Sequence, residues 1–320
     1  MKGSFLRRMF FAFSALTLAA SVLFCFSCSS GGTGDSGQTG DDLTDGSSAD
    51  PSGDTGPGEE TDAPSGTVEV KPDPPASGQE KIIYPGDLPA DVFVSSDGTE
   101  LPYRYYIPED YSDEYAYPLL VYLHGAGECG TDNVSQLSAA VSFFIPKTLP
   151  TYQSIMLFPQ CPYDECWIGI RDPRGIESVS LDETPVTRGL QAVLELVEHI
   201  NGKYSTNPGR QYITGVSNGG CAVWTVIERH PDMFTAAVPL CGIGDPEFAS
   251  RLTDMPIRVY HGTADNVVTI EASRLMVRSI KEAGGENIDL VEVEGAGHNV
   301  TGAAYGDTGM WEWLFSQRKY

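Results

Sequence analysis

Residues 210–230 constrain the fold of this 320-residue chain more than any other segment. The sequence there, RQYITGVSNGGCAVWTVIERH, combines a short β-rich run, a glycine-rich turn and an amphipathic helix that ends before Pro231. Ser217 stands at the centre of the turn, in the chain's only Gly-x-Ser-x-Gly pattern. A serine in such a turn is strained, and the helix can approach the strand only if Gly215 and Gly219 lack side chains. The segment therefore predicts a strand–serine–helix junction, a nucleophile elbow.

Strands and helices alternate on both sides of this junction. Residues 117–123, YPLLVYL, form an uninterrupted apolar run, which is typical of a strand covered on both faces. Similar but shorter runs lie at 154–158, 211–214, 236–240, 257–260 and 288–293, and amphipathic stretches lie at 187–204 and 270–282. Residues 91–95 and 101–107 predict a hairpin. The alternation predicts an α/β fold, a mostly parallel, doubly wound sheet with helices on both faces and a site at the carboxyl ends of the strands.

Composition divides the chain into three parts. Residues 1–28 place Lys2, Arg7 and Arg8 before an apolar run, as a secretory signal does. Residues 29–80 are rich in Gly, Ser, Pro and Asp and poor in large apolar side chains, so burial cannot offset the entropy of ordering them. We expect a disordered linker there. Residues 81–320 are long enough for one catalytic domain with a substantial core.

The end of the apolar run predicts how the chain is held outside the cell. Cys28 follows Ser27 and precedes the flexible residues 29–32, an arrangement that resembles a bacterial lipoprotein signal. The resemblance implies that Cys28 is lipidated and becomes the first residue, although Cys25 stands where that motif usually has Leu. An uncleaved anchor and plain secretion are the alternatives. We expect an exported cell-surface lipoprotein whose only membrane contact is its N-terminal lipid.

The net charge limits the kinds of macromolecule that this chain can bind. The formal net charge is −24, and so acidic a chain repels phosphate backbones and anionic membrane surfaces. We therefore expect no nucleic-acid partner.

Beyond the signal five cysteines remain, an odd number, and a Cys161–Cys166 disulfide is one option that spacing does not decide. Beyond the signal, the sequence has no Cys-x-x-Cys or His-x-x-x-His spacing, so we expect no metal and no cofactor.

Ser217 needs a base, because a serine hydroxyl is a poor nucleophile at neutral pH. In folds with this elbow the order along the chain is serine, acid, histidine. His298 lies in a glycine-rich loop past the last predicted strand and fits the base. His230 adjoins the end of the elbow helix and is expected to cap it. His261 precedes the best acid candidate, so it does not fit the order.

The base needs an acid to orient it. Asp265 lies in the loop directly after the predicted strand 257–260, and Asp245, one strand earlier, is the alternative. The sequence predicts a catalytic triad of Ser217, Asp265 and His298.

Two backbone amides should receive the oxyanion of an acyl-transfer reaction. One is the amide of Asn218, the residue after the nucleophile. The other should come from residues 123–128, LHGAGE, where Ala126 is the first candidate and Gly127 the second. A plain turn is the alternative for these glycines. Glu128 either orients this loop or is an ordinary surface charge.

Several separate motifs resemble the α/β hydrolases often described as predicted peptidases, which are related to polyhydroxybutyrate depolymerase-like and feruloyl-esterase-like serine esterases. The motifs are HGAGECGTDN at 124–133, PQCP at 159–162, Trp167, NPGRQYITGVSNGG at 207–220, Cys241-Gly242 and HGTAD at 261–265. The resemblance spans about residues 91–313 and implies the triad and oxyanion roles given above. Cys129 departs from it, because such sequences more often carry Arg there.

The expected activity is hydrolysis of carboxylic esters through an acyl-enzyme, with feruloyl or acetyl esters of plant polysaccharides as candidate substrates. Residues 81–320 leave no room for the gating domain of the related prolyl oligopeptidases, which favours esters over peptides. A prolyl-oligopeptidase-like serine peptidase and a noncatalytic binding module are the alternatives. Tyr163 and Trp167 are candidate aromatic contacts for the substrate. Trp224 is expected in the core, and Trp311 and Trp313 are expected to pack a terminal helix.

Overall fold

The structure is a computed structural model that describes residues 71–76, 85–138, 148, 151–162 and 165–319. Three of the sequence predictions fall outside these residues: the signal at 1–28 with its lipidation site Cys28, most of the linker at 29–80, and Tyr163.

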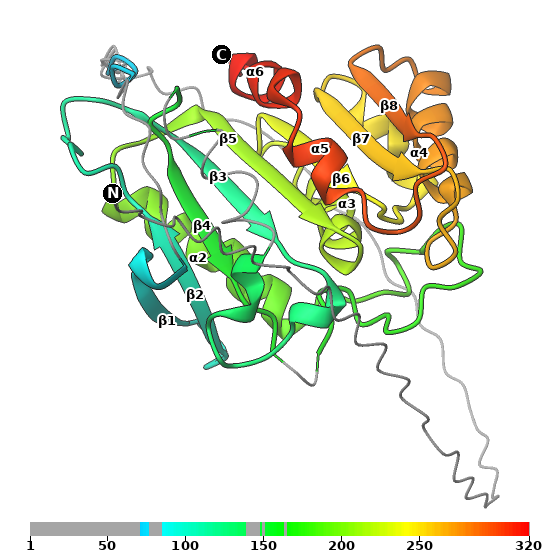
Figure 1. The fold of residues 1–320 in the computed structure, drawn as a ribbon, viewed down its shortest axis with the longest axis horizontal. Helices are drawn as coiled ribbons and strands as arrows, with labels where there is room; N and C mark the ends of the chain where they lie inside the picture. The colour runs from blue at the N-terminus through cyan, green and yellow to red at the C-terminus, as the bar shows by residue number, and fades with distance from the viewer. Residues whose placement is uncertain (1–70, 77–84, 139–147, 149–150, 163–164, 320) are drawn as a thin grey trace, which may run out of the picture. The chain divides into compact units, whose positions relative to one another are not determined.

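An eight-stranded sheet forms the centre of the domain, in the order β1-β2-β4-β3-β5-β6-β7-β8 (Figure 1). β1 pairs antiparallel with β2, and β2 with β4, whereas every later neighbour is parallel. The strands are β1 (Ala90–Val94), β2 (Glu100–Tyr106), β3 (Tyr117–Leu123), β4 (Ile155–Pro159), β5 (Thr206–Val216), β6 (Ala236–Leu240), β7 (Ile257–Gly262) and β8 (Ile288–Val293). The predicted α/β-hydrolase fold is confirmed, as is its N-terminal hairpin.

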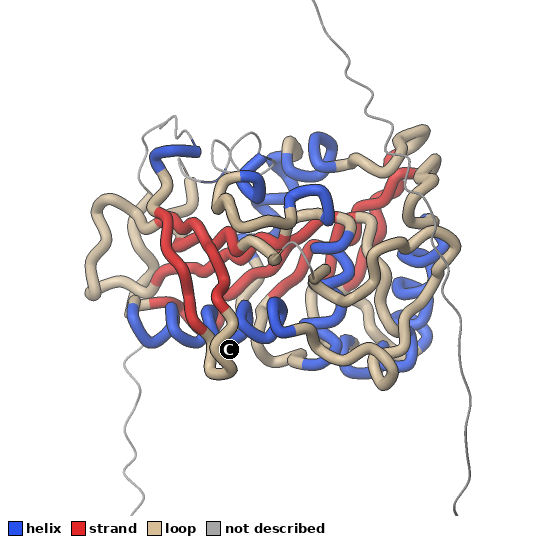
Figure 2. The backbone as a smooth tube through the Cα atoms, turned by 90° about the horizontal axis from the view of Figure 1, so that it is seen from below, coloured by secondary structure: helices blue, strands red, loops and turns tan. Residues whose placement is uncertain are grey.

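Helices cover both faces of this sheet (Figure 2). One face carries α2 (Arg188–Lys203), α3 (Asn218–Arg229) and α4 (Ile270–Glu282), and the other carries α5 (Thr301–Tyr305) and α6 (Thr308–Ser316). Threonine side chains begin two of these helices: Thr187 accepts a hydrogen bond from Leu190 N in α2, and Thr269 accepts one from Glu271 N in α4.

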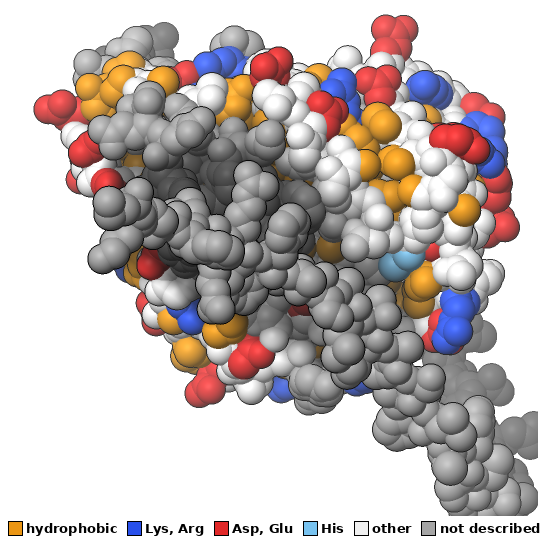
Figure 3. Space-filling view, in the orientation of Figure 1, with side chains coloured by type: hydrophobic (Ala, Val, Ile, Leu, Met, Phe, Trp, Pro, Cys, Tyr) orange, Lys and Arg blue, Asp and Glu red, His pale blue; other side chains and the backbone are white. Residues whose placement is uncertain are grey.

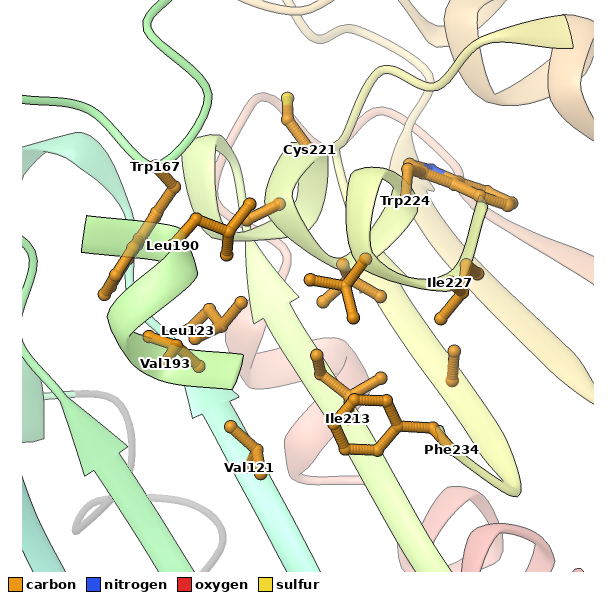
Figure 4. Close-up of a cluster of buried hydrophobic side chains, with 14 of the residues drawn as sticks. Val121, Leu123, Trp167, Leu190, Val193, Ile213, Cys221, Trp224, Ile227 and Phe234 are labelled. Carbon is orange, nitrogen blue, oxygen red and sulfur yellow. The ribbon is translucent and has the colours of Figure 1, made fainter. Parts of the chain in front are cut away.

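Alternation along β3 builds two hydrophobic cores. Val121 and Leu123 point toward α2 and α3, whereas Leu120 and Tyr122 point toward α5 and α6. Figure 4 shows the first core, where Leu123 of β3 lies near Leu190 and Val193 of α2, and Ile213 of β5 lies near Phe234 beneath α3. Because both faces are buried, these strands are apolar throughout, and their carboxyl ends are held firmly where the functional loops begin.

Residues 71–76 lie against the domain, although composition assigns them to the linker. Pro72 O accepts a hydrogen bond of 2.9 Å from Ala116 N, and the Asp73 carboxylate lies 3.0 Å from the guanidinium of Arg210. Residues 71–76 thus pair with the domain although they precede the boundary expected at residue 81. Polar pairing rather than apolar burial holds this segment, and composition does not detect such pairing.

Acidic side chains are spread over the visible face of the domain, with basic side chains between them (Figure 3). Among the helices of the described residues, none has the length and apolar character needed to cross a membrane.

Candidate active site

Ser217 occupies a strained turn between β5 and α3. Its backbone has φ 57° and ψ −118°, which is rare for a residue with a side chain. A Cβ on Gly219 would lie 2.0 Å from Leu123 O, and one on Gly215 would lie 2.5 Å from Gly219 O. The steric need for glycine at both positions, predicted from the sequence, is confirmed.

A continuous hydrogen-bonded chain runs from Ser217 through His298 to Asp265. Ser217 Oγ lies 2.7 Å from His298 Nε2, and His298 Nδ1 lies 2.7 Å from Asp265 Oδ2. Each residue follows a different parallel strand: Ser217 follows β5, Asp265 follows β7 and His298 follows β8. The imidazole is 24% exposed and the carboxyl group 0%. The structure thus brings together the three residues predicted as a triad.

The environment of Asp265 keeps it ionised. Burial opposes the charge, but hydrogen bonds from His298 and the backbone amides of Val267 and Val268 outweigh it, and the pKa of Asp265 lies below its ordinary value. A carboxylate accepts from His298 Nδ1–H, so Nε2 of the neutral ring carries the lone pair that faces the Ser217 hydroxyl. This arrangement can take a proton from the serine.

The alternative acid and base lie elsewhere. Asp245 begins the 3-10 helix Pro246–Leu252, and its carboxylate accepts hydrogen bonds from Glu247 N and Leu181 N at 3.0 Å and 2.8 Å. His230 is exposed at the end of α3, where its backbone N–H donates to Val226 O. Neither residue hydrogen-bonds to a member of the chain formed by Ser217, His298 and Asp265.

A cavity of about 520 Å³ opens over Ser217 and His298. Its wall includes Ala126 and Gly127, which lie exposed in the 3-10 helix Ala126–Glu128 after β3. Asn218 is the first residue of α3, where a backbone N–H has no acceptor within its own helix. The predicted amide donors therefore lie beside the serine, on two different segments.

Glu128 holds the loop that carries Ala126. One carboxylate oxygen accepts a hydrogen bond of 2.9 Å from Gly125 N, and the other accepts one from the Ser138 hydroxyl. Burial raises the pKa of this carboxyl group. Of the two alternatives left open by the sequence, the structure favours the one in which Glu128 orients the loop.

The prediction that Trp167 contacts substrate is wrong. Its side chain is 0% exposed, and its indole Nε1 donates to His124 O at 3.0 Å. Its backbone N–H also donates to Asn218 Oδ1 at 2.7 Å. Trp167 packs between the loop after β3 and the start of α3, where a large ring with one donor fills the gap. Trp224 and Trp311 are buried, as expected, and Tyr163 stays a prediction.

Two buried histidines beside the site have roles that sequence reasoning missed. Burial lowers the pKa of His124 to about 4, so the ring is neutral at neutral pH. His124 Nδ1 donates to Gly125 O at 2.7 Å, and Nε2 accepts from Cys161 N at 2.9 Å. His261 lies behind Asp265, with Nε2 3.2 Å from the carboxylate. The sequence signal that could have indicated these roles is a His-Gly pair directly after a predicted strand, present after residues 117–123 and after residues 257–260.

The sulfur atoms near the site are thiols. The described cysteines 129, 161, 166, 221 and 241 are all free, so the optional Cys161–Cys166 disulfide is not formed. Cys241, His261 and Asp265 offer donor atoms within 4.8 Å of one another. Both His261 nitrogens and the Asp265 carboxylate already have hydrogen-bond partners, so this cluster is built as a hydrogen-bonded support.

Comparison with known proteins agrees with this geometry. The model of the prolyl oligopeptidase family matches residues 186–258, which include Ser217 but neither Asp265 nor His298. A thermostable esterase of known structure is 34% identical, with a TM-score of 0.65 over 73% of this chain and 64% of that one. The present chain thus spans under two thirds of that esterase.

Two further relatives are more distant. A probable carboxylesterase of Oryza sativa subsp. japonica is 23% identical over 188 residues, which are 52% of this chain and 76% of the rice protein. The feruloyl esterase module from Clostridium thermocellum is 15% identical, with a TM-score of 0.50 over 73% of this chain and 89% of the module, and shows the fold alone. The chain thus has the α/β-hydrolase fold and is similar, at 34% identity, to an esterase of known structure that shares this fold.

Proposed function

We propose that this protein hydrolyses carboxylic esters through an acyl-enzyme on Ser217, with His298 as general base and Asp265 as the acid that orients it. One observation carries the proposal. The hydrogen bonds from Ser217 to His298 and from His298 to Asp265, both 2.7 Å, form a chain that ends at a cavity. A serine, a base and an ionised acid in this order are what acyl transfer requires.

The first half of the reaction forms the acyl-enzyme. His298 Nε2 takes the proton of Ser217 as Oγ bonds to the ester carbonyl carbon, and the carbonyl π electrons move to oxygen. The amides of Ala126 and Asn218 stabilise that oxyanion. When the intermediate collapses, the C–O bond to the alcohol breaks and His298 returns its proton to the departing alcohol oxygen. Asp265 stays ionised throughout and stabilises the transient imidazolium.

The second half releases the acid. Water enters the cavity, His298 takes its proton, and the hydroxide oxygen bonds to the acyl carbon. Collapse returns the electron pair to Ser217 Oγ, which recovers the proton from His298. No oxidant, reductant or metal takes part in either half.

Esters of plant polysaccharides, feruloyl or acetyl, are the proposed substrates. The fold likeness to a feruloyl esterase module supports this class. The cavity wall combines the apolar Val216 and Val267 with the polar Asn299 and Thr301, which suits an acyl group that carries oxygen atoms.

Peptide hydrolysis is the second candidate, because the prolyl oligopeptidase model matches the segment with Ser217. Alcohols leave more readily than amines, so a serine triad acts faster on esters than on amides unless other residues position the leaving amine. Specificity constants on matched feruloyl ester, acetyl ester and peptide substrates decide between the two. A higher constant on peptides would overturn the ester proposal while leaving the triad intact.

Ser217→Ala tests the chemistry. We expect kcat to fall by roughly 10⁵–10⁶-fold and covalent labelling by a fluorophosphonate to vanish, while the circular dichroism spectrum is unchanged. Ser316→Ala, at an exposed position on α6, is the matched control and should keep both activity and labelling. Labelling that persists in Ser217→Ala would show that another residue is the nucleophile.

We also propose that the protein is exported and lipidated on Cys28, from the signal and linker pattern of the sequence. Cys28→Ser should move the protein from the membrane fraction to the soluble fraction and abolish labelling with a palmitate analogue. Unchanged fractionation with retained label would contradict lipidation at this cysteine.

A further inference from the structure

The second-to-last residue of β7 is His261, a histidine that the mechanism above does not use. Its side chain is 0% exposed. Nε2 lies 2.9 Å from Val268 O and 3.2 Å from Asp265 Oδ2. Nδ1 lies 2.7 Å from Ser273 Oγ. The ring is thus held between the acid of the triad and the first turn of α4.

The neighbours of His261 determine which nitrogen carries the proton. Val268 O is a pure acceptor, and so is the ionised Asp265 carboxylate, so Nε2 must be the donor. Burial lowers the pKa of His261, which keeps the ring neutral at neutral pH. Nδ1 therefore carries a lone pair and accepts the hydroxyl proton of Ser273, which is itself fully buried. Val268 O and Asp265 thus select the Nε2–H form of the ring, and the Ser273 hydroxyl completes it by donating to Nδ1.

Asp265 Oδ2 consequently accepts from two imidazoles, His298 Nδ1 at 2.7 Å and His261 Nε2 at 3.2 Å. Its other oxygen, Oδ1, accepts from the amides of Val267 and Val268 at 2.8 Å and 3.0 Å. A second donor on Oδ2 restricts rotation of the carboxyl group. Because His261 is neutral, it adds no full positive charge that would oppose the imidazolium formed on His298.

We propose that His261 is a positioning residue for ester hydrolysis, which fixes the Asp265 carboxylate where His298 needs it, and that Ser273 holds the His261 ring in place through its hydrogen bond to Nδ1. The inference rests on the proposed roles of Ser217, His298 and Asp265. It differs from a merely structural role, because a positioning residue acts on kcat through Asp265 and not through the fold.

Substitutions at His261 test this directly. His261→Leu should lower kcat on an aryl ester by about tenfold with little change in KM, since the lost donor acts on the triad and not on substrate binding. His261→Gln keeps an N–H donor near the position of Nε2 and should recover most of that loss. His199→Gln, the same change at an exposed position on α2, is the matched control and should leave kcat unchanged. Equal kcat values for His261→Leu and the parent protein would overturn the proposal.

A double-mutant cycle with Asp265→Asn separates positioning from packing. We expect His261→Leu to lower kcat in the parent protein and to have no further effect in the Asp265→Asn background. An equal fold-loss in both backgrounds would show that His261 only supports the fold, and would overturn the inference. If His261→Leu fails to fold, Ser273→Ala takes its place, with an expected loss of about threefold in the parent and none in Asp265→Asn.

The failure of this inference can be told from the failure of the proposed function. Loss of fluorophosphonate labelling in Ser217→Ala with unaffected His261 variants leaves the triad standing and rejects the role of His261. Persistent labelling in Ser217→Ala rejects the triad, and with it the role of His261.

Discussion

β3 and β7 end in the same short pattern, a histidine, a glycine, two further residues and an acid. The pattern is His124 to Glu128 directly after β3, and His261 to Asp265 at the end of β7, whose last two residues are His261 and Gly262. Both histidines are fully buried, and burial lowers the pKa of each. They adopt opposite tautomers, because His124 donates from Nδ1 to Gly125 O whereas His261 donates from Nε2.

The two acids bind different partners. Glu128 is long enough to reach back to Gly125 N, so its charge serves its own loop. Asp265 is one methylene shorter, and its Oδ1 accepts the amides of Val267 and Val268 that follow it. Oδ2 is left to face His298. The same local pattern therefore serves two purposes. The longer Glu128 holds the loop with the amide donors, whereas the shorter Asp265 presents its charge to His298.

Neutralising each acid should show this difference most strongly. Asp265→Asn should lower kcat by roughly 10³–10⁴-fold, because the amide no longer favours the His298 tautomer or stabilises its charged form. Glu128→Gln, the matched change after β3, should cost only about tenfold, since an amide oxygen can still accept from Gly125 N. Steady-state kinetics on one aryl ester measures both. Equal losses would mean that the two acids are not used differently.

Removing one amide donor tests the β3 side alone. Ala126→Pro deletes a backbone N–H at the first position of a 3-10 helix, where proline is tolerated, after Gly125 at φ −76° and ψ 171°. We expect kcat to fall by roughly 10²–10³-fold with KM nearly constant. Gly127→Ala is the control, because a Cβ there meets no atom within 4 Å. Full activity in Ala126→Pro would move the donor role to Gly127, the second candidate.

The buried His124 should make stability depend on pH. Its pKa is about 4 in the folded protein and about 6.5 when unfolded, so between these values the unfolded state binds more protons. The free energy of unfolding should be highest above pH 6.5 and fall by on the order of 3 kcal/mol as the pH drops to 4. Urea denaturation at several pH values measures this.

His124→Gln should flatten the acidic part of that profile, whereas His230→Gln, at an exposed position, should leave it unchanged. Parallel profiles for the parent protein and His124→Gln would mean that another group carries the pH dependence.

The sequence was sufficient for the fold because apolar runs and helical periodicity are local signals. Residues 117–123 and 270–282 match β3 and α4 at both ends. The three residues of the candidate triad followed from chain order, since each lies just past a strand. Chain order also excluded His261 as the base, because it precedes Asp265. Chain order cannot show that the loop after β7 folds back and places the Asp265 carboxylate against His261. Trp167 was misjudged because its burial depends on α3, about 50 residues later, through Asn218.

Residues 71–76 pair with the domain at the end of the sheet opposite the cavity. Lys71 and Pro72 contact Ser205 and Ala116, which directly precede β5 and β3. Ser217 lies past the other end of β5, whose 11 residues span roughly 33 Å. The full depth of the sheet thus separates the point of attachment from the mouth of the cavity. If the lipid proposed at Cys28 holds the chain, its pull would reach the domain at the end of the sheet opposite the cavity.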